Sequence, residues 1–108
     1  MRGVSWYPGM LIDLLLGRGS SSSSRRVIAV EEDKETVSRV FARAPYFKIV
    51  EDGRVVGVVR NPYVGAVPAG PPAARFVARY RPSEVVAGSI GPLARRELEK
   101  LGIRVLTR

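Results

Sequence analysis

The sequence predicts an α/β domain built on a mixed five-stranded sheet. Three observations lead to this class: five short runs rich in β-branched residues, an Asp-Gly pair between two of them, and two segments with helical periodicity that alternate with strands. With 108 residues, 45% of them hydrophobic and 26% charged, the chain has the length and composition of one small globular domain.

The first part of the pattern predicts three strands, two of them joined as a hairpin. Residues 27–30 form a continuous apolar run, which is typical of a buried central strand. Residues 46–50 and 55–59 form two more runs, and Asp52-Gly53 lies between them. This pair favours a tight hairpin turn, because both turn positions need positive φ. Asn61-Pro62 ends the third strand, since proline has no N–H for the ladder.

The second part of the pattern predicts two helices. The first covers residues 72–81, with proline at its first position and proline directly after its end. The second begins at Gly91-Pro92 and ends before Gly102, which suits a left-handed cap. The apolar face of this second helix is formed by Ala94, Leu98 and Leu101.

Strands at residues 85–87 and 103–106 complete the order β-β-β-α-β-α-β. Strand-helix-strand crossovers are right-handed, so the last unit predicts a parallel pair, whereas the hairpin predicts an antiparallel edge. One helical turn is expected over residues 36–41, ahead of Pro45. We therefore expect helices packed on a mixed sheet.

The first 25 residues differ from the rest in composition. Residues 10–16 (MLIDLLL) are apolar except for Asp13, and five serines at 20–24 follow. A Ser/Gly tract buries too little apolar surface to offset its ordering entropy, so we expect an extension and linker over 1–25 and a folded domain over 26–108. The apolar run is interpreted either as a short helix that docks on the domain or as a leader translated from an earlier start site.

The charge balance favours anionic partners. The chain carries 18 basic and 10 acidic residues, a net charge of +8, and 15 of the basic residues are arginine. Nucleic acid, phosphorylated metabolites and anionic cofactors suit such a surface, although a plainly solvated surface is the simpler interpretation of the charge. Scarcity of thermolabile side chains fits a thermophile.

Several function classes are excluded by residues that the chain lacks. Without Cys there are no disulfides or thiolate metal sites, and without His or Cys the common catalytic bases and nucleophiles are missing. No stretch approaches the ~20 apolar residues of a membrane span. We therefore expect a cytoplasmic protein that is not an enzyme and has no membrane partner.

Five short marks occur in order along residues 26–108. They are Arg43-Ala44-Pro45-Tyr46-Phe47, Asn61-Pro62, Gly70-Pro71, Ala87-Gly88-Ser89-Ile90-Gly91-Pro92 and Leu101-Gly102-Ile103-Arg104-Val105. Their order and spacing resemble the dinitrogenase iron–molybdenum cofactor family. The resemblance implies a ribonuclease-H-like, three-layer fold. It also implies a small protein that carries the nitrogenase cofactor or its precursor, an iron–molybdenum or iron–sulfur cluster.

Two positions depart from the pattern of this family. Relatives read Ser-x-His-Phe-Gly before the Arg-Ala-Pro-Tyr-Phe stretch, whereas here Val40 takes the His position and Ala42 the Gly position. Relatives also carry His after Asn-Pro, and residues 63–69 contain none. Val and Ala offer no lone pair to a metal, so we expect no cluster held by imidazole. An anionic cluster or an oxyanion, held by arginine and backbone N–H groups, remains open.

The predicted pocket combines the Arg43 loop, the Gly70 loop and the turn from Gly88 to Pro92. The turn joins the carboxyl end of a strand to a helix start, where anions bind in open α/β sheets; its other interpretation is a tight turn alone. The Arg43 guanidinium suits an oxyanion, or alternatively an ion pair with an acid among residues 31–33. The predicted ligand-binding residues are Arg43, Gly70, Gly88, Ser89, Ile90 and Gly91.

Two further interpretations belong to other function classes. An arginine-rich helical face, formed by Arg75, Arg79, Arg95 and Arg96, is the alternative that would bind nucleic acid or a protein. The acidic run at residues 31–35 would serve a nuclease only if more carboxylates converged on it, so we interpret it as a solvated loop. The leading hypothesis is a non-enzymatic protein that binds an anionic small ligand or cluster.

Overall fold

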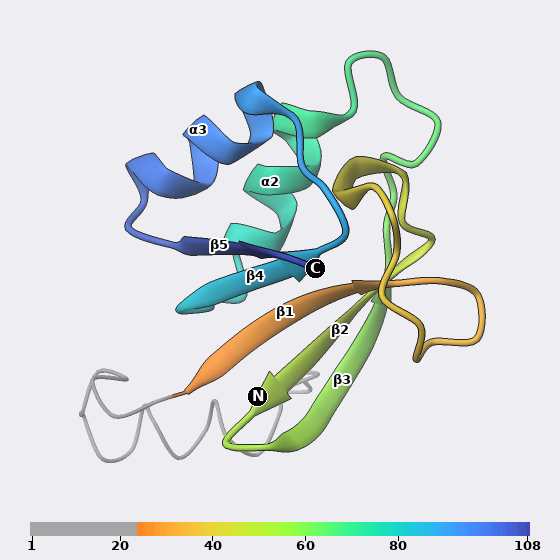
Figure 1. Ribbon diagram of the computed structural model, residues 1–108, viewed down its shortest axis with the longest axis vertical. Helices are drawn as coiled ribbons and strands as arrows, with labels where there is room; N and C mark the ends of the chain where they lie inside the picture. Colours follow the sequence, from red (N-terminus) through yellow and green to blue (C-terminus); the bar gives the residue numbers. More distant parts are fainter. Residues whose placement is uncertain (1–23) are drawn as a thin grey trace, which may run out of the picture.

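The computed structural model describes residues 24–108 as a five-stranded mixed sheet with two α-helices and one short 3₁₀ helix (Figure 1). In chain order the elements are β1 (Arg25–Val30), η1 (Phe41–Arg43), β2 (Tyr46–Glu51), β3 (Arg54–Arg60), α2 (Gly70–Ala78), β4 (Glu84–Ala87), α3 (Pro92–Lys100) and β5 (Arg104–Thr107). The predicted mixed α/β class is confirmed. The extension expected over residues 1–25 lies outside the described residues, apart from its last two positions.

The sheet has the strand order β3-β2-β1-β4-β5, so β1 is central. β1 pairs with β2 antiparallel, with Val27 opposite Ile49, and β2 continues antiparallel into β3. On its other side β1 pairs with β4 parallel, with Val27 opposite Val85, and β4 pairs with β5 parallel. The predicted parallel pair and antiparallel edge are both confirmed.

The hairpin turn between β2 and β3 has the predicted geometry. Asp52 has a φ of 53° and Gly53 a φ of 80°, and Glu51 pairs with Arg54 across the turn. Positive φ at both central positions is the requirement that makes Asp-Gly a strong hairpin signal. Further along, the pairing shifts register between Ile49 and Val50, as it does at a β-bulge.

The predicted bounds of the first helix are wrong at both ends. α2 begins at Gly70, so Pro72 occupies its third position and not its first. Proline is tolerated there because the first-turn N–H groups have no intrahelical partner. The regular helix ends at Ala78, and the N–H groups of residues 79–81 bond three residues back, which tightens the chain into a turn.

The second helix begins and is capped as predicted. Gly91 is the N-cap residue of α3, and Gly102 has a φ of 78°, which confirms the left-handed cap. Leu101 does not share the buried face with Ala94 and Leu98, and 59% of it is exposed. The reason is that the chain leaves helical geometry at Leu101, the C-cap residue.

One hydrophobic core lies between the sheet and the two helices, which share one face of the sheet (Figure 1). Strand residues Val27, Ala29, Phe47, Ile49, Val85 and Ala87 meet helix residues Ala73, Ala74, Val77, Ala94 and Leu98 in it. The second face of the sheet carries no helix within residues 24–108. The three-layer arrangement is therefore not seen in this part of the chain, which forms two layers. Within the same residues, no helix is long and apolar enough to cross a membrane.

The expected helical turn over residues 36–41 is wrong. Val37 forms an isolated bridge with Val30, and the Ser38 N–H donates to the Ala29 carbonyl at 2.7 Å. Only residues 41–43 are helical, as η1. The segment satisfies its backbone groups on β1 and β4 and not within itself, because tertiary pairing overrides the weak local preference.

Candidate functional site

Three loops meet at the edge of the sheet where β1 and β4 end, here called the carboxyl edge (Figure 1). They are residues 31–45 after β1, 61–69 after β3 and 88–91 after β4. β1 and β4 are parallel neighbours, yet the chain leaves β1 toward β2 and leaves β4 toward β5 on the opposite side. Such a reversal is the switch point at which open α/β sheets bind ligands.

The segment at residues 37–41 lies across this switch point. The Ser38 N–H donates to the Ala29 carbonyl on β1, and the Ser38 carbonyl accepts the Gly88 N–H after β4, both at 2.7 Å. The Phe41 N–H donates to the Ser89 carbonyl at 2.9 Å. The ends of two strands are therefore joined through one short stretch of backbone.

Gly88 and Ser89 hold this segment in place. A β-carbon at Gly88 would stand 2.8 Å from the Arg39 Cα atom, a distance that real β-carbons do not adopt. The Ser89 hydroxyl donates to the Arg39 carbonyl at 2.8 Å. The structure thus gives both predicted binding residues a backbone partner within the chain, and Arg39 is a neighbour that the sequence did not single out.

Gly70 joins the two helices. A β-carbon at Gly70 would lie 3.2 Å from the Ala94 β-carbon, so α2 begins in close contact with the first turn of α3. Ile90 is half-buried and packs against the hydrophobic core. Gly91 has open space around its Cα atom. Of the predicted glycines at this edge, Gly91 is therefore the one with room for a ligand.

The start of α3 carries a positive partial charge that no side chain caps. The N-cap residue Gly91 forms no side-chain hydrogen bond, and there is no acid in the first turn. Pro92 has no N–H, and the Arg95 N–H donates to the Gly91 carbonyl. The amides of Leu93 and Ala94 lie ahead of the first intrahelical bond, where a helix dipole favours an anion.

Arg43 fixes the loop after β3. One nitrogen of its guanidinium donates to the Val64 carbonyl at 2.7 Å and to the Ala66 carbonyl at 3.1 Å. Among residues 24–108 Arg43 forms no ion pair, so the alternative pairing with Glu31, Glu32 or Asp33 is wrong. Its side chain is exposed, and its charge is not balanced by a carboxylate in this part of the chain.

Asn61 ties the same loop to the segment before β2. It is 1% exposed, and its amide nitrogen donates to the carbonyls of Ala42 and Ala44 at 3.0 and 2.9 Å. Its side-chain oxygen accepts the Tyr63 N–H at 2.9 Å. In the sequence, Asn61 together with Pro62 indicated only the end of a strand. The sequence feature that could have drawn attention to Asn61 is that it is the single Asn in the chain.

Two exposed arginines border the carboxyl edge. Arg39 lies against Gly88 and Arg43 lies against the 61–69 loop, and neither pairs with a carboxylate among the described residues. Together with the uncapped start of α3 they place cationic groups at this edge, while the acidic run at residues 31–35 belongs to the same loop as both arginines. The arrangement suits an anion bound by hydrogen bonds and offers no metal ligand with an imidazole or thiolate.

The predicted arginine-rich helical face is partly neutralised. Arg75 lies 3.9 Å from a Glu97 carboxylate oxygen, and Arg95 lies 3.6 Å from one of Glu99. Arg79 and Arg96 are exposed and form no ion pair among residues 24–108. The face therefore offers two unpaired cations and not the four that the sequence suggested.

The acidic run after β1 forms a self-contained turn. Asp33 accepts hydrogen bonds from the backbone N–H groups of Glu35 and Thr36 at 2.8 Å and from the Thr36 hydroxyl. The hydroxyl bond, and then the two backbone bonds, lower the pKa of Asp33 from 3.8 to about 2. Within residues 24–108 no group of three or more acidic side chains gathers to hold a metal ion. Residues 32–35 of the run are exposed and Glu31 is half-buried, which agrees with the interpretation of a solvated loop.

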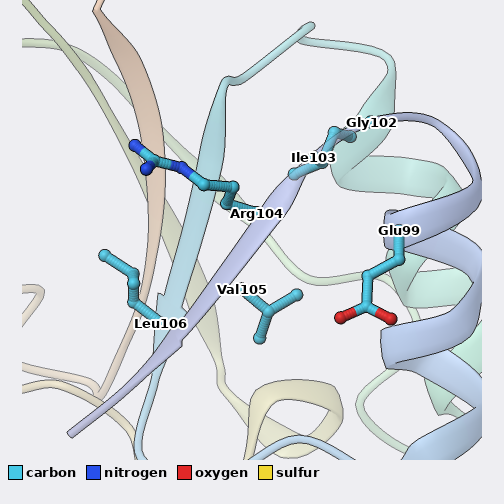
Figure 2. A pocket seen from close by; sticks show the side chains of 6 residues that line it. All are labelled: Glu99, Gly102, Ile103, Arg104, Val105 and Leu106. Carbon is cyan, nitrogen blue, oxygen red and sulfur yellow. The ribbon is translucent and has the colours of Figure 1, made fainter.

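A shallow, open hollow of about 400 Å³ lies elsewhere, beside the edge strand β5 (Figure 2). It is lined by Glu99, Gly102, Ile103, Arg104, Val105 and Leu106. Figure 2 shows Arg104 and Leu106 pointing to one side of β5, while Val105 points toward the Glu99 side. The Glu99 carboxylate already pairs with Arg95. None of the predicted binding residues lines this hollow.

Comparison with known proteins identifies the family. The family model for the dinitrogenase iron-molybdenum cofactor matches residues 24–108. The chain belongs to this family. A search of curated proteins finds no match for the sequence.

Solved structures of similar proteins agree with this membership. PH0822 is 30% identical with a TM-score of 0.65, over 77% of this chain and 75% of its own. The apo form of the orange protein from Desulfovibrio gigas is 26% identical with a TM-score of 0.67, over 76% and 72%. A putative NifB protein from Thermotoga, TM1290, is 30% identical with a TM-score of 0.61, over 76% and 73%.

The residues present fit a ligand held by hydrogen bonds and charge better than a metal held by direct ligation. With no His and no Cys in the chain, a metal cannot be ligated by imidazole or thiolate. The guanidinium groups of Arg39 and Arg43 and the first amides of α3 can bind the surface of an anionic cluster or an oxyanion through hydrogen bonds.

Proposed function

We propose that this member of the iron–molybdenum cofactor family is a non-enzymatic protein that binds an anionic ligand at the carboxyl edge. One observation carries the proposal: Arg39, Arg43 and the uncapped start of α3 border a single switch point, and neither arginine forms an ion pair among residues 24–108. Helix N-termini and guanidinium groups bind anions without metal ligation.

The ligand class is an anionic metal cluster or an oxyanion such as phosphate. Membership of the family supports the cluster. The absence of His and Cys supports binding by hydrogen bonds and charge, which a cluster and an oxyanion share. The ribonuclease-H-like class and a cytoplasmic location belong to the same proposal.

The experiment is anaerobic gel filtration of the full chain with isolated iron–molybdenum cofactor, with molybdenum and iron measured in the protein peak. We expect co-elution with the wild-type chain and its loss in Arg39→Gln and Arg43→Gln. Arg54→Gln is the matched control, because Arg54 begins β3 at the hairpin turn, the opposite end of the sheet. Titration with molybdate and with phosphate separates a cluster site from an oxyanion site.

Two results would overturn the proposal. One is the absence of binding for the cofactor and for both oxyanions. The other is equal binding by the wild-type chain and both edge variants, which would place the ligand elsewhere. Because Arg43 also holds the 61–69 loop, the spectrum of each variant must first match that of the folded wild-type chain.

The second candidate is a nucleic-acid- or protein-binding module that uses the helical face. The exposure of Arg79 and Arg96, which have no carboxylate partner among residues 24–108, favours it. The ion pairs of Arg75 and Arg95 count against it. Affinity for nucleic acid that falls steeply with salt, and falls further in Arg79→Gln/Arg96→Gln, would support this candidate.

A further inference from the structure

The sheet face opposite α2 and α3, here called the open face, carries apolar side chains that residues 24–108 leave partly uncovered. Val55 is 55% exposed, Val58 is 40% exposed and Leu106 is 39% exposed. Val50 lies opposite Val55 on this face, so the apolar surface continues from β3 onto β2, whereas Leu106 lies on β5 at the other edge of the sheet. The open face belongs to the sheet and does not include the proposed anion site.

One end of the open face is covered and the other is not. Near the carboxyl edge Val30 is fully buried, and Val37 pairs with it. The hairpin-turn end, with Val50 and Val55, has no such cover within the described residues. The uncovered part of the face therefore lies beside the hairpin.

The charges of the open face indicate what kind of occupant fits. Arg26, Lys48, Arg60 and Arg104 lie on it, and the acid Glu84 is already bonded to Arg26 at 2.7 Å and to Arg104 at 3.1 Å. Lys48 forms no ion pair among residues 24–108, and its charge contributes to the lowered pKa of Asp33. A second copy would bring like charges together, whereas an apolar segment with an acid would complement the face.

The chain itself contains such a segment. Residues 10–16, MLIDLLL, are six apolar residues and one acid, Asp13, which is the only acid before residue 31. We propose that Met10–Leu16 binds across the open face with Asp13 beside Lys48. The segment thereby covers the exposed valines of β3 and removes their apolar surface from water.

The connection is long enough for this binding. The described chain begins at Ser24, whose carbonyl accepts the Asp52 N–H at 3.4 Å, so it enters the sheet beside the hairpin turn. Eight residues from Leu16 to Ser24 span up to about 27 Å when extended. A strand of six residues is about 20 Å long, so the segment can reach any part of the open face.

The test uses the full chain, in which a single introduced cysteine is a unique labelling position because the protein has none. A nitroxide at Gly17→Cys should broaden the amide signals of Val55 and Val58 beyond detection. The signals of Ala74 and Leu98, in the helices on the other face, should remain. Mixing spin-labelled, unenriched chain with unlabelled, isotope-enriched chain separates binding within one chain from binding between chains.

Two variants supply the controls. Leu14→Asp/Leu15→Asp should restore the lost signals, while Leu101→Asp, at an exposed position after α3, should leave them lost. Asp13→Lys should weaken the broadening of the Val55 and Val58 signals. Adding Lys48→Asp to this variant exchanges the two charges and should restore the broadening. This charge exchange keeps the comparison decisive if the double leucine variant does not fold.

Three outcomes would overturn the proposal. Broadening of equal strength on both faces would show that the segment has no preferred site. Broadening that persists in Leu14→Asp/Leu15→Asp in a folded chain would show that the apolar run is not the occupant. Broadening found only between chains in the mixing experiment would assign the open face to a second copy.

Discussion

Gly88 and the backbone of Arg39 lie in direct contact, so close that a β-carbon at residue 88 would stand 2.8 Å from both the Cα atom and the carbonyl oxygen of Arg39. The Gly88 N–H donates to the Ser38 carbonyl, and the Ser89 hydroxyl donates to the Arg39 carbonyl. This contact is the junction between the loop after β1 and the turn after β4. The absence of a side chain at residue 88 therefore allows these two loops to pack against each other.

Substitution of Gly88 by alanine should destabilise the protein by about 1–3 kcal/mol, the range for overpacking a well-packed site. The cost arises because the neighbouring atoms are backbone and cannot rotate away. Urea unfolding of the full chain measures it. Gly65→Ala is the control, since nothing lies within 4 Å of a β-carbon there. Equal stability of the two variants would contradict the described contact.

Substitution of Asn61 by alanine should cost about 2–4 kcal/mol of unfolding free energy, because the buried carbonyl of Ala44 and the partly buried carbonyl of Ala42 lose their donor. An unsatisfied buried group costs roughly 1–3 kcal/mol, and a partly buried one costs less because water can reach it. The Tyr63 amide should also exchange faster with solvent, since it loses its acceptor. Denaturant unfolding and amide exchange check the two effects. Val64→Ala, at an exposed position of the same loop, should change neither; an unchanged Tyr63 exchange rate in the Asn61 variant would refute this role.

The turn after β1 should respond to acid at an unusually low pH. Hydrogen bonds hold the pKa of Asp33 at about 2 in the folded chain, below its ordinary value of 3.8. A lowered folded pKa means that the stabilisation is present above pH 3.8 and is lost as pH falls toward 2. An NMR titration should show the amides of Glu35 and Thr36 moving with a midpoint near pH 2. In Asp33→Asn this step should vanish, and a midpoint near 3.8 in the wild-type chain would count against the turn.

The carboxylate of Glu84 should contribute more to the stability of the fold than the carboxylates of exposed ion pairs. Its side chain is 7% exposed and receives both Arg26 and Arg104, whose side chains are 41% and 75% exposed. We expect Glu84→Gln to cost about 1–2 kcal/mol, less than the ~3–5 kcal/mol of a fully buried pair, because water can still reach both guanidinium groups. Thermal and urea unfolding measure the change. Glu99→Gln, from an exposed pair, should cost less than about 0.5 kcal/mol, and a larger loss there would reverse the ranking.

The sheet and its connections were predictable because their signals are local. The Asp52-Gly53 turn needs positive φ at two adjacent residues, and Gly102 needs it at a helix end, so each residue type reports its own backbone. The bounds of α2 were less predictable. Two adjacent prolines fit any of the first helical positions, and the sequence does not distinguish among them.

The carboxyl edge was predictable in place but not in detail. The order of strands and helices put the three loops at one edge, and the structure ties them together there. The sequence did not reveal that Gly88 is needed for a backbone contact or that Gly70 is needed for helix packing. A glycine that is required only for space has no local signature. Arg39 and Asn61 were missed because the backbone groups that they contact lie 17 to 50 residues away along the chain.

The central position of β1 has a consequence for the order in which the protein folds. β1, β2 and β3 are close in sequence, whereas β4 must return to β1 across a connection that contains the hairpin and α2. Because closing long loops is slow, we expect the antiparallel half to form first and the parallel half to dock onto it. The carboxyl edge lies at the seam between these halves. A ligand held there would be bound only by chains that have finished folding.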